Sequence, residues 1–317
     1  MVVLMTAPAW TPGLAVIVAL LLDRLCGEPP AWAHPVVAMG RYLGLTGPWL
    51  VTLRPLVAFV GGALAWLVGA ALVLGPALAA DHWLRGLHGV WAGLALGVLL
   101  KPLLAWRMLR DEVRAVEAAL AESLAAGRTR LQRLVSRDVS RLNARQVRES
   151  AIESLAENLN DSLVAPLFWF ALGGLPGAAL YRWANTADAM WGYRGRYEWA
   201  GKWAARADDV LSWLPARLTA VLLCLASWRR PSWRALRIEA RRTASPNGGW
   251  PMGTMALLLD VQLRKPGTYV LNTAGRLPEA SHTRQALAWC GRVVLWAAGL
   301  SVAAAATLAA LGVGAAP

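Results

Sequence analysis

PLVAFVGGALAWLVGAALVLGPALAA, residues 55–80, contains no charged side chain. A helix needs about 20 mainly apolar residues to cross the hydrocarbon core of a bilayer, and this run exceeds that length. Three further runs have the same character, at residues 2–22, 87–106 and 286–313. The sequence therefore predicts an all-α, polytopic integral membrane protein with about four firm transmembrane helices. Near the end of the third run, Lys101 is expected to extend toward the interface and Pro102 to kink the helix.

Two weaker apolar segments, residues 163–180 and 211–228, leave the topology open. The first is broken by Gly and Pro, and the second carries Arg217. Either could be a span, a re-entrant element or a buried helix. We favour four spans, because that arrangement keeps every basic cluster on one side. The chain is then a single membrane-embedded domain, 1–317, in the inner (cytoplasmic) membrane, with a helical active-site region, 107–285, facing the cytoplasm.

The composition supports a membrane protein and argues against a nucleic-acid-binding one. Hydrophobic residues make up 57% of the chain and charged residues 16%, which is too apolar for an average soluble domain. The net charge of +13 is concentrated in long segments between the apolar runs, as expected of cytoplasmic loops. No nucleic-acid-binding motif accompanies this charge, so we expect no nucleic-acid partner.

The stretch ESAIESLAENLND, residues 149–161, concentrates acid in this basic chain. In a helix, Glu149, Glu153, Glu157 and Asp161 follow one another at i, i+4 steps and share a face. Like charges at this spacing repel by about 0.2–0.5 kcal/mol per pair, so the ladder calls for Mg²⁺, a cationic ligand or arginines from elsewhere. The alternative is a solvated face on which Arg145 pairs with Glu149.

Four other polar stretches have chemical potential, although each alone is a weak signal. Asp208-Asp209 is more often a cap or turn than a metal site. Ser-Pro-Asn-Gly-Gly is first of all a turn, or else a loop whose N–H groups cradle a phosphate. The four stretches are DRLCGEPPAWAHP (23–35), NTADAMWGYR (185–194), AARADDV (204–210) and SPNGGWPM (245–252).

Taken together and in this order, these motifs resemble the CobD/CbiB family of cobalamin (vitamin B12) biosynthesis, the adenosylcobinamide-phosphate synthases. The resemblance runs from Asp23 to about Tyr269. It implies a membrane ligase that joins adenosylcobyric acid, a corrinoid substrate, to an aminoalcohol phosphate, typically (R)-1-aminopropan-2-ol phosphate. The reaction it implies is an amide ligation that depends on ATP and Mg²⁺. Other late enzymes of the pathway are candidate partners.

Such a reaction needs carboxylates for Mg²⁺ and for acid–base work, together with donors for phosphate. The candidate catalytic residues are Glu153, Glu157, Asp161 and Asp208. The candidate metal ligands are Glu153, Glu157, Asp188, Asp208 and Asp209. The candidate substrate- and phosphate-binding residues are Asn158, Asn185, Arg194, Arg206, Ser245, Asn247, Gly248 and Gly249.

Two rival functions remain open. A non-catalytic, AmpE-like membrane sensor or partner would be expected to lack the acidic positions, and they are present here. A transporter of a bulky solute would carry functional charges at mid-membrane and broken helices, for which only Arg217 and the 163–180 segment give a hint. The acidic residues therefore favour the enzyme.

Overall fold

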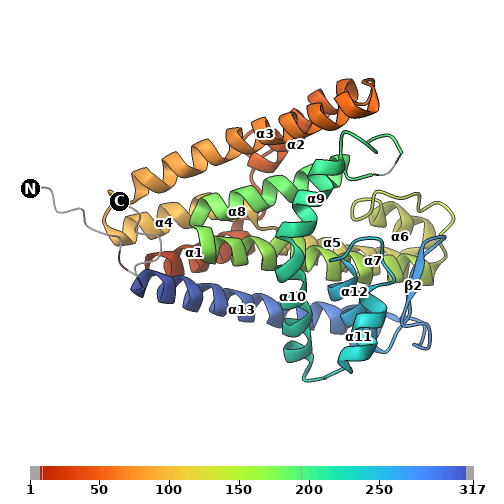
Figure 1. The fold of residues 1–317 in the computed structure, drawn as a ribbon. Helices are drawn as coiled ribbons and strands as arrows, with labels where there is room; N and C mark the ends of the chain where they lie inside the picture. The colour runs from red at the N-terminus through yellow and green to blue at the C-terminus, as the bar shows by residue number, and fades with distance from the viewer. Residues whose placement is uncertain (1–7, 9, 194, 312–317) are drawn as a thin grey trace, which may run out of the picture. The chain divides into compact units, whose positions relative to one another are not determined.

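The computed structural model of the chain describes residue 8 and residues 10–193 and 195–311. Helices make up most of these residues, which confirms the predicted all-α, polytopic class (Figure 1). The α-helices are α1 (Thr11–Cys26), α2 (Pro35–Leu50), α3 (Pro55–Leu84), α4 (Gly89–Leu100), α5 (Trp106–Glu122), α6 (Leu124–Leu131), α7 (Ala144–Leu159), α8 (Ala165–Trp191), α9 (Lys202–Leu211), α10 (Trp213–Ser227), α11 (Trp233–Ala240), α12 (Gly249–Leu259) and α13 (Ala280–Ala310). The remaining elements are the 3-10 turn η1 (Lys101–Leu103), the π-helical turn η2 (Asn160–Val164) and the strands β1 (Leu263–Lys265) and β2 (Tyr269–Leu271).

Within the described residues, four helical stretches are long and apolar enough to cross a membrane. Three of them coincide with the predicted runs 55–80, 87–106 and 286–313, although residues 312 and 313 lie outside the described part of the chain. The bent pair α9–α10, which turns by 46°, would make a fifth. The four stretches are Pro55–Leu84, Gly89–Glu122, Ala144–Trp191 and Ala280–Leu308.

The fourth stretch differs from the preferred topology. The segment 163–180 lies in Ala144–Trp191, which reaches spanning length because α7, η2 and α8 follow one another without a loop. The predicted span 2–22 lies partly outside the described residues, at residues 2–7 and 9. Its remainder belongs to α1, whose 16 residues are too few for this helix to be one of the four.

The chain, expected to be one domain, divides into two compact units, and each is discontinuous in sequence. Unit 1 comprises residues 1–105, 165–212 and 298–317. Unit 2 comprises residues 106–164 and 213–297. The five polar motifs are thereby distributed over two bodies. The 149–161 and 245–252 stretches lie in unit 2, and the other three lie in unit 1.

Unit 1 is organised around α8, against which α2, α3 and α9 pack, while α1 packs on α4. The large buried side chains Trp183 and Trp191 of α8 anchor this core. Their indole nitrogens donate to the backbone oxygens of Trp66 in α3 and Leu43 in α2, each at 3.2 Å. A Cβ at Gly69 of α3 would lie 2.2 Å from the Trp183 ring, so only glycine permits this approach.

Unit 2 is organised around α7, which contacts α5, α6, α12 and β1. A capping box formed by Asn143 and Gln146 fixes its start. At its other end the π-helical turn η2 carries Asn160, whose side-chain oxygen accepts a 3.0 Å hydrogen bond from Thr219 of α10. Because π-turns shift the helical register, Asp161 does not continue the i, i+4 ladder of α7 unchanged. The hairpin β1–β2 is a small addition to the all-α prediction, and its register pairs Leu263 with Leu271.

Candidate functional site

The acidic face of α7 is buried in unit 2. Glu149 is 2% exposed and Glu153 5%, so a solvated face is the wrong interpretation for these two carboxylates. One carboxylate oxygen of each, Oε2, is buried without a hydrogen-bond partner among the described residues. Glu157, one turn further on, is half-buried. Burying carboxylates costs free energy unless donors or cations compensate them, which makes their surroundings informative.

Cationic and hydroxyl groups from other parts of unit 2 face these carboxylates. Arg137, from the segment before α7, lies with its Nη2 3.5 Å from Glu153 Oε1. Tyr269 of β2 donates a 3.0 Å hydrogen bond to the same oxygen. Burial first, and then the charges of Glu153 and Glu157, raise the pKa of Tyr269 above its ordinary value of 10.0, so the hydroxyl remains a donor at neutral pH. We call Glu149, Glu153, Glu157, Arg137 and Tyr269 the carboxylate–arginine cluster.

The guanidinium of Arg137 has hydrogen-bonding capacity that this cluster does not satisfy. Its three nitrogens are buried, and none has a hydrogen-bond partner among the described residues. A guanidinium offers five N–H donors in a planar fork that suits carboxylates and phosphates. The sequence does not single out Arg137, because it is one of ten arginines between residues 107 and 148 and nothing in its spacing distinguishes it.

The Ser245–Gly249 loop lies against the same cluster. A Cβ at Gly248 would come within 3.1 Å of Glu157 Oε1, so the loop backbone and this carboxylate are adjacent. The loop's own hydrogen bonds account for part of its sequence, because Ser245 Oγ accepts from the N–H groups of Asn247 and Gly248, each at 3.2 Å. Gly249 is sterically required, since a Cβ there would lie 2.2 Å from the Ala240 oxygen.

Arg217 holds this loop from α10. Its guanidinium lies over the rings of Trp213 and Trp250, at 4.3 and 4.8 Å from their centroids. It also donates a 3.0 Å hydrogen bond to Asn247 Oδ1. Asn247 is 3% exposed, so its side chain serves the loop's structure in this arrangement. The charge that hinted at a transporter is thus engaged in positioning the loop.

The other predicted residues lie in unit 1 or make local contacts. Asp208 of α9 accepts 3.4 Å hydrogen bonds from Asn185 of α8 and from Ser212. Asp209 pairs with the exposed Arg206 at 3.5 Å. Asn158, in unit 2, donates to the Ser154 backbone oxygen at 3.0 Å.

The predicted roles of all these residues stay predictions. Arg194 lies outside the described residues. Asp188 lies on the same helix, α8, as Asn185, and its backbone oxygen accepts from the Gly192 N–H. Among the described residues no group of three or more His, Cys, Asp or Glu side chains could hold a metal ion. The predicted metal ligands therefore remain candidates as carboxylate pairs, the form in which Mg²⁺ binds with substrate phosphates completing its shell.

The first polar motif forms a second buried cluster in unit 1, the Lys101 cluster. Lys101 is 4% exposed, and its Nζ lies 2.9 Å from Glu28 Oε2 and 3.4 Å from Asp23 Oδ1. His34 Nε2 lies 3.1 Å from the same Glu28 oxygen. Burial acts to raise the pKa of Glu28, but hydrogen bonds from His34 and Lys101 outweigh it and hold the pKa below its ordinary value. The expectation that Lys101 extends to the interface is wrong, because two carboxylates hold it inside.

The fold and these clusters define a polytopic membrane protein that carries two sets of buried, mutually compensating charges. The chain belongs to the CobD/CbiB family of cobalamin biosynthesis proteins: the sequence model described as "CobD/Cbib protein" matches residues 16–309. It is 37% identical to "Cobalamin biosynthesis protein CobD" of Dehalococcoides mccartyi over 80% of this chain and 85% of that protein. It is 41% identical to "Probable cobalamin biosynthesis protein CobD" of Pyrococcus abyssi, over 85% and 88%. The Chromobacterium violaceum protein named "Cobalamin biosynthesis protein CobD" is 38% identical over 93% and 97%. No solved structure matches this chain.

Proposed function

We propose that this protein is an adenosylcobinamide-phosphate synthase, which ligates adenosylcobyric acid to an aminoalcohol phosphate with consumption of ATP. One observation carries the proposal beyond family membership: the carboxylate–arginine cluster holds acceptor and donor groups that are buried without partners. Buried polar groups are rarely left unpaired, and such groups often mark a binding or catalytic site. The reactants of the ligation would supply the missing partners: phosphate oxygens for Arg137, and a metal ion or an amine for the carboxylates.

The chemistry assigns roles to the chain's own residues. Activation of the corrinoid carboxylate as an acyl phosphate places transferred phosphate oxygens beside a donor, the role we give to the Arg137 guanidinium. The amine of the aminoalcohol phosphate then forms the new C–N bond while phosphate leaves the carbonyl carbon. Glu157 would take the proton that the nitrogen loses, since it is half-buried beside the Ser245–Gly249 loop. The loop would position the phosphate of that amine.

Mg²⁺ fits the residues present as a carboxylate pair. Glu153 has an oxygen without a partner, and Glu157 follows one helical turn later. Bound there with nucleotide phosphates, Mg²⁺ would neutralise the phosphoryl charge. Asp208 and Asp209 of α9 are a second candidate pair in unit 1, and Asp188 of α8 is a further candidate ligand. Tyr269 supports Glu153 as a catalytic residue or as a metal ligand, because the hydrogen bond from its hydroxyl fixes the orientation of the Glu153 carboxylate.

The proposed setting is the inner membrane, with the site on the cytoplasmic side, where ATP is present. The support is the charge distribution: the segments between the apolar runs carry the basic residues, ten of them arginines between residues 107 and 148. Adenosylcobyric acid and the aminoalcohol phosphate are the proposed soluble partners, and other late enzymes of cobalamin biosynthesis are proposed protein partners.

The test is ligation by the detergent-purified protein. ATP should be consumed only when cobyric acid and the aminoalcohol phosphate are both supplied with Mg²⁺, and the amide product should appear by mass spectrometry. ATP-independent flux of the corrinoid across proteoliposomes, without ligation, would favour a transporter. Binding without turnover would favour a non-catalytic, AmpE-like protein.

Two variants test the residue assignment. Glu157→Gln and Asp208→Asn should each abolish ligation while the protein keeps its elution volume and melting profile. Glu122→Gln, at an exposed carboxylate of α5 in the same unit as Glu157, is the matched control and should keep full activity. Near-normal turnover in both Glu157→Gln and Asp208→Asn would remove the metal and base assignments.

A further inference from the structure

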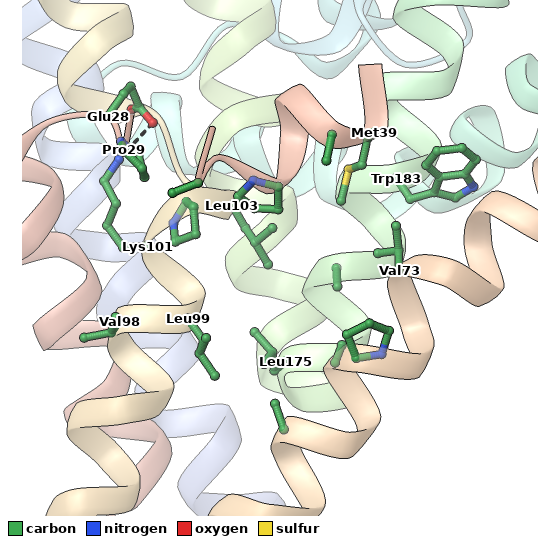
Figure 2. A pocket seen from close by; sticks show the side chains of 18 of the residues that line it. Glu28, Pro29, Met39, Val73, Val98, Leu99, Lys101, Leu103, Leu175 and Trp183 are labelled. Atoms are coloured by element: carbon green, nitrogen blue, oxygen red, sulfur yellow. Dashed lines mark ion pairs between the residues drawn. The ribbon is translucent and has the colours of Figure 1, made fainter. Parts of the chain in front are cut away.

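Unit 1 contains a cavity of about 910 Å³, a volume within the range of small-molecule sites. Residues of α1, α2, α3, α4, α8, η1 and the loop after α1 line it, and almost all of them are apolar. Figure 2 shows Val73 of α3, Leu99 of α4 and Leu175 of α8 around it. An apolar wall of this extent binds a ligand by burying hydrocarbon or ring surface, and it offers few partners to a polar solute.

The rim of the cavity lies on helices of membrane-spanning character. Leu72 of α3 and Val98 of α4 both line the cavity, and they are 61% and 57% exposed. Both belong to stretches that are long and apolar enough to cross a bilayer, Pro55–Leu84 and Gly89–Glu122. In a membrane, such exposed leucine and valine side chains face acyl chains. The cavity is therefore accessible from the lipid phase.

One end of the cavity is polar. Glu28 and Lys101, joined by their 2.9 Å ion pair, lie at this end (Figure 2). The second carboxylate oxygen of Glu28, Oε1, is buried and has no hydrogen-bond partner among the described residues. Lys101 is also contacted by Asp23, so two carboxylates share one ammonium, with the His34 imidazole beside Glu28. A carboxylate oxygen can only accept, so the missing partner must be an N–H or O–H donor.

We propose that this cavity binds a membrane lipid, with an acyl chain along the apolar wall and a donor-bearing head group hydrogen-bonded to Glu28. The donor is an ammonium or a hydroxyl group. A head group that presents only anionic oxygens at this point has no donor to offer Glu28 Oε1 and is therefore excluded. The proposal rests on the lining and on Glu28, to which the proposed ligation assigns no role, so it stands or falls independently of that activity.

Lipid retention by the detergent-purified protein tests the head group. Native mass spectrometry is carried out with equal amounts of phosphatidylethanolamine, phosphatidylglycerol and phosphatidylcholine, the last of which has no N–H or O–H donor in its head group. We expect phosphatidylcholine to be retained roughly tenfold less than the better of the other two, the effect of one charge-assisted hydrogen bond. Preference for phosphatidylethanolamine would identify an ammonium donor, and preference for phosphatidylglycerol a hydroxyl donor. Equal retention of all three would overturn the proposal.

Substitutions in the wall test the location. Val73→Trp fills the cavity and should remove the preferentially retained lipid. Leu67→Trp is the matched control, because it places the same side chain on α3 at an exposed position outside the cavity lining. Should Val73→Trp fail to fold, Leu99→Trp approaches from the opposite wall. Retention unchanged in a folded wall variant, or lost equally in Leu67→Trp, would contradict a site in this cavity.

A photoreactive lipid gives an independent readout. Phosphatidylethanolamine with a diazirine in its acyl chain should label the α3, α4 and α8 residues of the lining, and Glu28→Ala should reduce that labelling roughly tenfold. Labelling spread evenly over the exposed faces of α3 and α13 would show bulk lipid contact only and would refute a specific site.

Discussion

Replacement of Lys101 by methionine should destabilise the protein strongly, because it removes the ammonium that lies against the buried Asp23 and the half-buried Glu28. At Nζ–O distances of 2.9 Å to Glu28 and 3.4 Å to Asp23, each attraction is about 5–6 kcal/mol at an effective dielectric constant of 20, before desolvation is subtracted. Lys101 is 4% exposed and Asp23 1%, so water cannot replace the lost ammonium. Removal of one partner from a buried ion pair typically costs about 3–5 kcal/mol, which is the loss we expect for Lys101→Met.

The assay is the free energy of unfolding in mixed micelles, measured as a function of pH. In the native protein the pKa of Glu28 is lowered, so its stabilising contribution is complete above the ordinary glutamate value of 4.5 and is lost as the pH falls through the folded-state pKa. The variant keeps the His34 part of this contribution and loses the Lys101 part. The difference between the two proteins should therefore be largest at neutral pH and shrink in acid.

A double variant separates charge from packing. Lys101→Met combined with Glu28→Gln should recover part of the stability, because it removes one of the two carboxylates that lost the Lys101 ammonium. A cost below about 1 kcal/mol for Lys101→Met, or a deficit that stays constant between pH 7 and pH 4, would refute the reasoning. It would mean that the pair is hydrated in solution.

Two further substitutions test packing in unit 1 and hydrogen bonding in unit 2. Gly69→Ala should destabilise by about 1–3 kcal/mol, since its Cβ meets the buried Trp183 ring. Gly75→Ala is the control on the same helix, because a Cβ there would have nothing within 4 Å, and it should be neutral or stabilising. Thermal melts of the two variants measure the difference in stability. Tyr269→Phe should cost about 1.5–3 kcal/mol by removing the donor to Glu153. Because the pKa of Tyr269 is raised, denaturation should show a constant deficit from pH 7 to pH 10 and a smaller one above it, where unfolded tyrosine ionises.

Long runs of uncharged, apolar residues were sufficient to predict a polytopic membrane protein from the sequence. The segment 55–80 could hardly be anything but a lipid-facing helix, and in the structure it lies in α3. Segment 163–180 was harder, because Gly173 and Gly174 interrupt its periodicity. Both residues do have non-helical backbone angles inside α8, yet the helix resumes after them and the whole stretch attains spanning length. The local sequence predicted this break. It did not predict that α8 continues beyond the break, which depends on the packing of α8 against α2 and α3.

The sequence by itself determined the acidic ladder of α7, because an i, i+4 spacing depends only on helical geometry. What compensates that ladder was decided by tertiary structure. Arg137 and Tyr269 are 16 and 116 residues from Glu153, and no local pattern relates such positions. The same holds for Lys101, whose sequence context suggested an interfacial side chain until the fold placed Asp23 and Glu28 beside it. Spacing along a helix fixes which charges share a face, but only the folded chain determines which distant charges meet them.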